Sequence, residues 1–396
     1  MSATGLPRRG AIHDVVIVGA GPAGLFCALR LARVGRDVVV LEEHATVGAP
    51  THCTGVVSAE LQEFYKASDD IVLHRPTSCV VVSPRGATAE FQSLGEDIAV
   101  LDRRAFDAAL AAEAQQAGAT IVTDSRVDDI RVGRAVVEVV TAHGETFVAR
   151  AVVLAYGVAY RFHRRMDFGF PPAVLHTAQL EVDGEPADAL QIHLGRQLAP
   201  GGFAWVVPIR RNGRSRIKTG MLLRGDARAR LNAFLASPRM AGRITGEIGH
   251  PILRLLPVSA PRRTYGERAL LVGDAAGLTK PVTGGGIFYS LLSADLAAET
   301  LEESLAADDL GAKRLSRYET RWRQRLGREL RTGGWFRHLL ANFTDAELDA
   351  FVNAIASDDV RAVITATARF NWHRPVILEL ARQPGIKSIL LRSLFR

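Results

Sequence analysis

Three glycines near the start of the chain have the spacing of a loop that binds a dinucleotide phosphate. Gly19, Gly21 and Gly24 form a G-x-G-x-x-G pattern between an apolar segment, 15–18, and a segment of helical periodicity, 22–34. The first glycine permits a tight turn, the second lets the backbone approach a pyrophosphate, and the third allows close helix–strand packing. The phosphates would lie at the positive end of the helix. We therefore predict a dinucleotide site here.

Glu42 supports this prediction because it ends the next apolar segment, 38–41, about twenty residues after the glycines. A carboxylate at that position accepts hydrogen bonds from an adenosine ribose. A glycine triplet alone is often an ordinary turn, but the triplet, its strand–helix–strand context and the acid together favour a nucleotide site. We also assign four neighbouring residues to the cofactor: Pro22, Ala23, Glu43 and Val127.

A second glycine-rich segment distinguishes FAD from NAD, which share the first pattern. The apolar run 269–272 leads into Gly273 and Asp274, and Pro281 precedes a further group of glycines. That group is Gly284, Gly285 and Gly286. The arrangement resembles the second flavin signature of the p-hydroxybenzoate hydroxylase-like superfamily. The resemblance implies that Asp274 binds the ribityl chain, and that a helix N-terminus stabilises negative charge at the flavin pyrimidine.

Arg103 is a further candidate for the flavin site. With Phe106 and Asp107 it forms an R-x-x-F-D stretch, in which the superfamily's arginine approaches the cofactor. The alternative is an ion pair at the surface.

Three segments together narrow the family. Cys53 lies in G-A-P-T-H-C-T-G, residues 48–55, and Phe203, Trp205 and Pro208 lie in G-G-F-A-W-V-V-P. The third segment is K-P-V-T-G-G-G. Together these segments resemble the geranylgeranyl reductase family, which saturates isoprenoid double bonds. The likeness extends over most of the chain. The resemblance implies an FAD-dependent reductase that saturates carbon–carbon double bonds of a geranylgeranyl-type chain by hydride transfer from reduced flavin.

Cys53 and His52 are the candidate catalytic residues. In the family the cysteine lies close to the flavin, and Cys53 matches that position. A small buried hydrophobe is the alternative for a cysteine. Saturating an isolated alkene needs a hydride on one carbon and a proton on the other, so the site must hold the alkene and supply a proton. His52, Cys53 and a bound water are the candidate donors.

Phe203, Trp205 and Pro208 are assigned to the substrate. Because Phe203 and Trp205 are two residues apart on a predicted strand, they face the same side and could form an apolar wall for a prenyl chain. Ordinary sheet core is the alternative. The family motif continues with G-x-G on the next strand, where this chain has Lys218-Thr219-Gly220. This departure puts the substrate in doubt more than the fold.

Strand and helix patterns alternate around both glycine-rich signatures, the early one and the late one. We predict an α/β fold with a discontinuous Rossmann-like FAD-binding domain, an inserted antiparallel-sheet substrate domain and a helical C-terminal region. The FAD-binding domain comprises 11–75, 100–165 and 260–300, the substrate sheet 76–99 and 166–259, and the helical region 301–396.

Composition sets the broad class. The chain has 396 residues, 47% hydrophobic and 23% charged, which suits a large globular core. No apolar run reaches the roughly 18 residues of a membrane-spanning helix and residues 1–10 lack a signal-peptide core, which predicts a cytoplasmic protein.

Cys27, Cys53 and Cys79 match no disulfide or metal pattern, so we expect no metal. The net charge of +7 suits an anionic partner, but no nucleic-acid module accompanies it.

Basic residues recur near the C-terminus. Five arginines, Arg314, Arg317, Arg321, Arg325 and Arg328, recur every three or four residues along one helical side, which is usually a solvated face. The last segment is a basic amphipathic helix, with Ile386, Ile389, Leu390 and Leu394 on one side and Lys387, Arg392 and Arg396 on another. It could rest peripherally on anionic lipid or pack against the protein.

The substrate and the reductant stay open. A prenyl diphosphate, a prenylated lipid, a chlorophyll-type ester and a quinone side chain all fit, and the oligomeric state is unknown. No second dinucleotide fingerprint is present, so NAD(P)H would bind transiently or a small electron-transfer protein would reduce the flavin. The main rival is an FAD-dependent aromatic or lipid monooxygenase. A flavin halogenase is weaker, because Phe203 stands where its first tryptophan belongs. A non-catalytic prenyl-lipid carrier is the third alternative.

Overall fold

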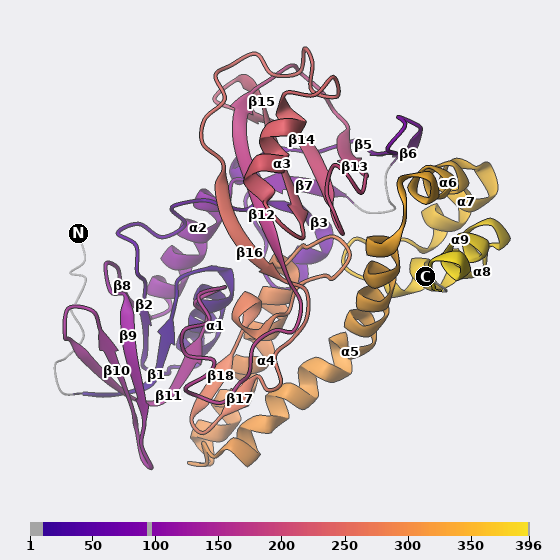
Figure 1. Ribbon diagram of the computed structural model, residues 1–396. Coiled ribbons are helices and arrows are strands. Elements are labelled where there is room, and N and C mark those ends of the chain that lie inside the picture. Colours follow the sequence, from indigo (N-terminus) through magenta and orange to yellow (C-terminus); the bar gives the residue numbers. More distant parts are fainter. Residues whose placement is uncertain (1–10, 93–96, 395–396) are drawn as a thin grey trace.

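The computed structural model describes residues 11–92 and 97–394, which form a mixed α/β protein (Figure 1). An eight-stranded sheet has the order β17-β18-β11-β1-β2-β8, with β10 and β9 attached to β11. Its strands are β1 (Ile12–Val18), β2 (Val38–Leu41), β8 (Thr120–Val122), β9 (Val127–Val132), β10 (Val137–Thr141), β11 (Thr146–Leu154), β17 (Tyr265–Gly266) and β18 (Ala269–Leu271). β1 is parallel to both β2 and β11, and β11 is parallel to β18. The late strand β18 thus completes a sheet begun at β1, which confirms the predicted discontinuity.

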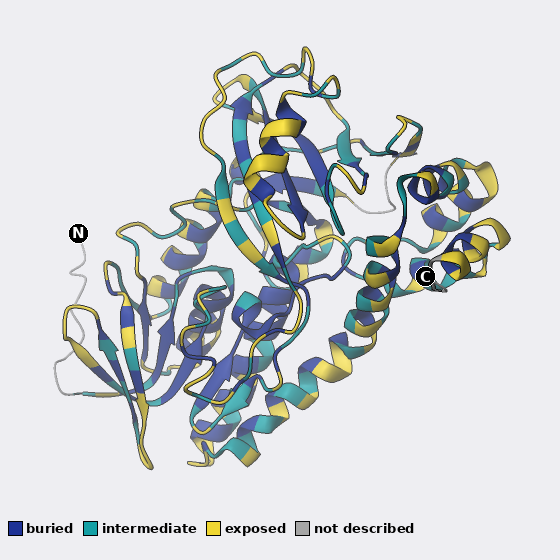
Figure 2. Ribbon diagram, viewed as in Figure 1, coloured by how far each residue is buried: buried dark blue, intermediate teal, exposed yellow. Residues whose placement is uncertain are grey.

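Helices cover this sheet because their apolar residues recur at helical spacing. They are α1 (Pro22–Arg33), α2 (Arg103–Gln116) and α4 (Ile287–Ala306). Residues 15–18 of β1 and all of β2 are apolar and buried, as expected of parallel strands covered on both faces. Figure 2 shows these strands in the buried colour.

A seven-stranded sheet forms the second layer, with the order β16-β12-β15-β14-β13-β5-β6. Its strands are β5 (Ser78–Val82), β6 (Thr88–Gln92), β12 (Val174–Asp183), β13 (Leu190–His193), β14 (Phe203–Arg211), β15 (Arg214–Leu223) and β16 (Ile252–Pro257). All neighbours are antiparallel except β13 and β5, which pair in parallel because a distant segment joins this edge. The helix α3 (Ala227–Leu235) packs on one face. A three-stranded sheet, β3 (Val56–Ser58), β7 (Ile98–Leu101) and β4 (Val72–His74), lies beside it.

The C-terminal region is helical, as predicted. The long α5 (Ala312–Asn342) leads to α6 (Asp345–Ala356), α7 (Asp358–Thr367), α8 (Arg374–Arg382) and α9 (Pro384–Leu394), which gather at the far end of α5 (Figure 1). In α6 a capping box between Thr344 and Glu347 satisfies the first turn.

The predicted amphipathic helix at the end of the chain is α9. Its apolar residues Ile386, Ile389 and Leu390 are buried in one cluster with α5, α6 and α8. Of the two alternatives, this face therefore packs against the protein. The side chain of Leu394 and the whole of Arg396 lie outside the described residues. No helix between residues 11 and 394, apart from the undescribed gap, is both long and apolar enough to cross a membrane.

Candidate active site

A continuous cavity of about 960 Å³ lies between the two large sheets and the C-terminal helices. The loop before α1 lines one part, the segment after β18 lines the middle, and apolar residues of α5 to α8 line the part farthest from α1. Most residues assigned to a site from the sequence meet here, although they come from distant parts of the chain.

The glycine loop has the shape that a pyrophosphate needs. A Cβ on Gly24 would overlap the carbonyl oxygen of Gly19, so only glycine lets α1 lie this close to β1. Gly19 has a φ of 106°, which favours glycine. In contrast, a Cβ on Gly21 would have no atom within 4 Å. The open space at Gly21, before the N-terminus of α1, fits the diphosphate of FAD.

Glu42 is fixed against this loop. Its Oε2 accepts a hydrogen bond from the Ala20 amide (2.7 Å), and its Oε1 accepts one from the His44 amide (3.0 Å). Glu42 is buried and lines the cavity together with Glu43 and Val127. The carboxylate therefore stabilises the glycine loop itself.

The second flavin signature forms a turn between β18 and α4. Gly273 has a φ of 61°, and the next residue, Asp274, lines the cavity. Burial raises the pKa of Asp274, while the Arg103 guanidinium lowers it. A Cβ on Gly286 would lie 3.1 Å from Asp274 Oδ1, so the turn and the acid are in close contact. Pro22, Ala23, Gly284 and Gly285 also line the cavity, whereas Gly273 and Pro281 support it from behind.

Arg103 forms a buried ion pair with Asp107 instead of a surface pair. Its Nη2 lies 3.0 Å from both Asp107 oxygens, and the two side chains are only 12% and 7% exposed. Burial alone would lower the pKa of the Arg103 guanidinium. Asp107 and, after it, Cys53 raise that pKa, and the net shift is upward. Arg103 therefore places a fixed positive charge beside Cys53.

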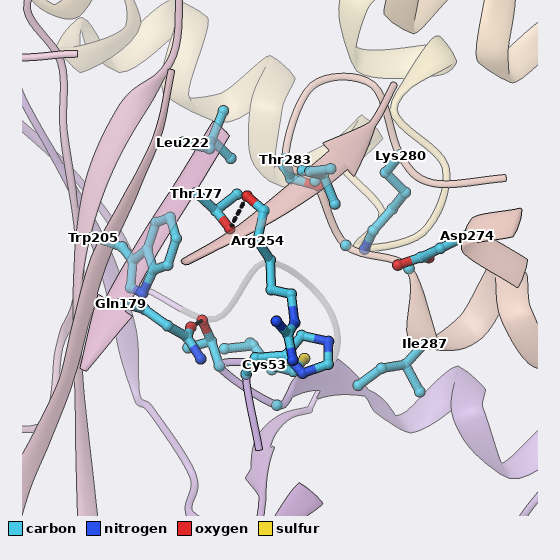
Figure 3. A pocket seen from close by; sticks show the side chains of 18 of the residues that line it. Cys53, Thr177, Gln179, Trp205, Leu222, Arg254, Asp274, Lys280, Thr283 and Ile287 are labelled. Atoms are coloured by element: carbon cyan, nitrogen blue, oxygen red, sulfur yellow. Dashed lines mark hydrogen bonds between the residues drawn. The ribbon is translucent and has the colours of Figure 1, made fainter. Parts of the chain in front are cut away.

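Cys53 and His52 both line the cavity, and Figure 3 shows Cys53 at its wall. Burial, and to a lesser extent the Arg254 guanidinium, lowers the pKa of His52 to about 4, so its imidazole is neutral at neutral pH. Its Nδ1 is 3.3 Å from the Pro50 carbonyl oxygen, which can only accept. The single ring proton is then on Nδ1 and not available on Nε2.

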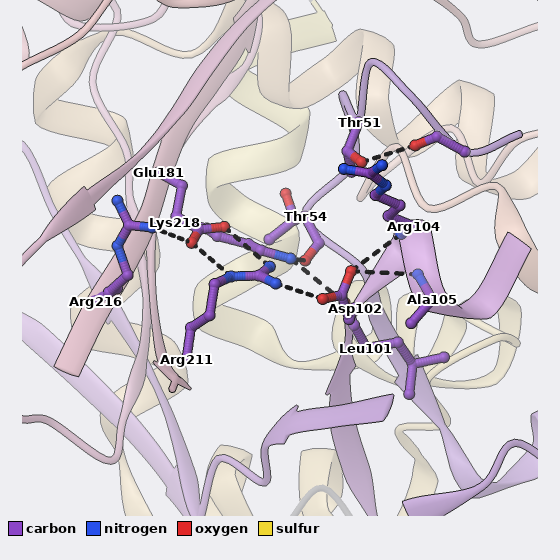
Figure 4. Close-up of polar contacts among 11 residues, drawn as sticks. Thr51, Thr54, Leu101, Asp102, Arg104, Ala105, Glu181, Arg211, Arg216 and Lys218 are labelled. Atoms are coloured by element: carbon purple, nitrogen blue, oxygen red, sulfur yellow. Dashed lines mark hydrogen bonds and ion pairs between the residues drawn. The ribbon is translucent and has the colours of Figure 1, made fainter. Parts of the chain in front are cut away.

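The loop that carries Cys53 is held from the seven-stranded sheet (Figure 4). Lys218 Nζ donates to the carbonyl oxygens of Thr54 (2.9 Å) and Leu101 (3.4 Å), and Thr54 Oγ1 donates to Gln179 Oε1 (3.2 Å). Lys218 is 6% exposed, and burial lowers its pKa, while Cys53 opposes that change. Lys218, which stands where the family motif has its first glycine, therefore holds the loop of Cys53 in place through hydrogen bonds.

An ionic network surrounds Lys218. Glu181 accepts from Arg211 Nε and Arg216 Nη1, both at 2.9 Å, and Arg211 also pairs with Asp102. Burial would raise the pKa of Asp102, but Arg211 lowers it to below its usual range. Asp102 in turn caps α2 through the Arg104 amide (3.1 Å). The network thus joins β12 and β15 to the helix that begins with Arg103.

Phe203 and Trp205 both line the cavity, with ring centroids 6.1 Å apart. The motif glycine that is kept, Gly220, pairs with Trp205, and a Cβ there would lie 2.6 Å from the Trp205 ring. Pro208 is not brought to the cavity. Because successive residues of a strand face opposite sides, it lies on the face of β14 away from Trp205.

Sequence reasoning missed the helical part of the cavity. Its apolar lining includes Phe336, Phe343, Leu348, Phe351, Ile364 and Leu380. It also missed Lys280, whose Nζ donates to the Phe370 carbonyl (2.9 Å) and Asn371 Oδ1 (3.2 Å) and so joins the flavin turn to this region. Helical spacing of apolar residues was a visible signal, but it does not tell cavity lining from core.

Comparisons with known proteins agree with this geometry. The family of pyridine nucleotide-disulphide oxidoreductases matches residues 13–171. Digeranylgeranylglycerophospholipid reductase 2 of Methanothermobacter thermautotrophicus is 31% identical, with 89% of this chain and 94% of that protein covered. The enzyme of the same name from Methanopyrus kandleri is 31% identical, with 94% and 97% covered.

Solved structures share the fold. A geranylgeranyl bacteriochlorophyll reductase-like protein of Thermoplasma acidophilum has a TM-score of 0.82 and 23% identity, covering 96% of this chain and 99% of that one. The flavin-dependent brominase Bmp2 has a TM-score of 0.72 and 16% identity, covering 98% and 100%. At these identities the likeness concerns the fold and not the reaction.

Proposed function

The chain belongs to the geranylgeranyl reductase family of FAD-dependent oxidoreductases, and from this premise we propose that it saturates carbon–carbon double bonds in the prenyl chains of a lipid. The observation that carries the proposal is the cavity, which joins the flavin signatures to a long apolar compartment. FAD, when bound, supplies the hydride. The curated relatives are named as reductases of digeranylgeranylglycerophospholipid, which supports a prenylated glycerolipid as substrate class.

The roles of the chain's own residues follow from their contacts. Phe203 and Trp205 provide an apolar wall that would hold the alkene and exclude water. Cys53, beside Arg103, or a water bound there would supply the proton, because the only ring proton of His52 is directed at the Pro50 carbonyl. We assign the electron source to transient NAD(P)H or to a small electron-transfer protein.

The test is anaerobic turnover. Purified protein with bound FAD is reduced with dithionite, and geranylgeranyl diphosphate or a prenylated glycerophospholipid is added while the flavin spectrum is followed. Reoxidation without oxygen, with two hydrogens gained per saturated bond in the product mass, is the expected result. Flavin that stays reduced until oxygen enters, followed by a hydroxylated product, would replace this proposal with a monooxygenase.

The helical part of the cavity predicts a chain-length effect. Ala368 at the end of α7 lines the cavity, so Ala368→Phe should fill the space for the far end of a long chain. We expect the rate with geranylgeranyl diphosphate to fall about tenfold, since crowding an apolar site costs on the order of 1–3 kcal/mol, while geranyl diphosphate reacts as before. The control is Ala366→Phe, an exposed neighbour that does not line the cavity. Equal loss for both substrates would contradict the prediction.

A further inference from the structure

One face of α5 carries five cations that form no ion pair among the residues that the structure describes. It consists of Lys313, Arg317, Arg325, Arg328 and Arg331, all exposed, and is called the α5 basic face below. Their spacing of three or four residues, or multiples of it, places them on one side of the helix. Among residues 11–92 and 97–394, none of the five forms an ion pair with a carboxylate, whereas Arg321 and Arg323 of the same helix do. These five charges are therefore not neutralised by ion pairs, although Arg325 lies 5.9 Å from the centroid of the Trp372 ring.

The face is long and ends in an exposed aromatic ring. From Lys313 to Arg331 it extends about 27 Å at 1.5 Å per residue. One turn further, Trp335 is 43% exposed, while Trp205 and Trp322 are buried. A tryptophan beside a row of cations is typical of helices that lie at a membrane interface, where the ring occupies the headgroup level.

The opposite side of α5 faces the cavity. Phe336 and Leu340 line it, and Gly333 packs against Pro281, with a Cβ there only 3.3 Å from the proline ring. Pro281 belongs to the flavin turn. The α5 basic face is thus separated from the candidate substrate compartment by the width of one helix, about 10 Å.

From these contacts we propose that the α5 basic face binds the surface of an anionic lipid membrane, with Trp335 in the headgroup region. The inference rests on the proposed function, because a reductase of prenyl lipids must collect its substrate from a lipid phase. The apolar side of α9 does not serve this purpose, because it is buried in the protein. The exposed Trp335 beside a long row of cations favours a membrane over an acidic protein.

The experiment measures vesicle binding by the full chain with FAD bound. Binding to phosphatidylcholine vesicles that contain phosphatidylglycerol, but not to pure phosphatidylcholine, is expected, and it should weaken as salt is added. Each basic residue near an anionic surface contributes about 1 kcal/mol. Arg317→Gln with Arg328→Gln should therefore weaken binding about 30-fold. The matched control is Arg210→Gln with Arg228→Gln, which removes the same charge from exposed positions elsewhere that form no ion pair among the described residues.

Tryptophan fluorescence provides the second measurement. Anionic vesicles should shift the emission to the blue, and Trp335→Phe should remove that shift. No binding to anionic vesicles, or equal binding by the Arg317/Arg328 variant and its control, would overturn the proposal. If that variant binds vesicles normally but loses reduction by an acidic electron-transfer protein, the face is a protein dock instead. Turnover of dissolved geranylgeranyl diphosphate should be unchanged in the Arg317/Arg328 variant. If no form of the protein turns over this substrate, that result counts against the proposed function and not against this surface.

Discussion

Gly21→Ala is expected to remove FAD from the protein without unfolding it. The φ of Gly21 is −80°, which alanine adopts freely, and a Cβ there meets no protein atom within 4 Å. The methyl group would instead occupy the space that the diphosphate needs. Loss of close hydrogen bonds from the loop to a charged group costs roughly 3 kcal/mol, or a dissociation constant more than about 100-fold higher. Flavin absorbance per protein after gel filtration and titration of the apoprotein with FAD measure the change.

The matched control is Gly24→Ala, three residues along the same loop. Its Cβ would overlap the Gly19 carbonyl and lie 3.1 Å from the Ala155 Cβ, so this variant should lower the unfolding temperature of the apoprotein itself. Gly21→Ala should leave that temperature unchanged. If Gly21→Ala retains FAD with normal affinity, the diphosphate does not lie at this loop and the cofactor site must be placed elsewhere.

The sequence predicted the parts of the fold that depend on local patterns. The first strand, its helix and the second strand follow from apolar periodicity, and the glycines follow from backbone geometry that only glycine supports. A Cβ on Gly24 would overlap the Gly19 carbonyl, and a Cβ on Gly19 would overlap the backbone of Ala155. The discontinuous sheet was visible because Gly273 and Asp274 follow an apolar run as β18 ends.

Features that depend on distant packing were not visible. The parallel pairing of β13 with β5 joins Leu190 to Cys79, far apart in sequence. Pro208, in contrast, could have been placed from the sequence, because a strand residue three positions from Trp205 faces the opposite side. For Lys218 the sequence showed only a departure from a glycine. Its partners, the carbonyls of Thr54 in the loop before β3 and of Leu101 in β7, are distant in sequence and became apparent only in three dimensions.

Cys53→Ala is expected to lower kcat by about 100-fold or more while FAD binding and KM change little. General acid catalysis contributes about 10²–10⁴-fold, and Cys53 is placed for it by the cavity wall and by the positive charge of Arg103. Rapid anaerobic mixing of the reduced protein with substrate would measure the step directly. The same activity in Cys53→Ala as in the unchanged protein would assign the proton to a bound water.

Lys218→Met tests whether the loop that carries Cys53 must be held in position for Cys53 to act. Methionine keeps most of the side-chain volume but removes the donor to the Thr54 and Leu101 carbonyls and one positive charge near Cys53. We expect kcat to fall about tenfold, and the rate at which iodoacetamide alkylates Cys53 to change, because the loop that positions the thiol loses its hydrogen bond from Lys218. Arg216→Met is the control, since Arg216 lies two residues away on the same face of β15 and contacts Glu181 and Asp183 instead of the loop. A loss of activity in Lys218→Met with unchanged alkylation would mean that Lys218 acts on the fold of the sheet and not on the position of Cys53.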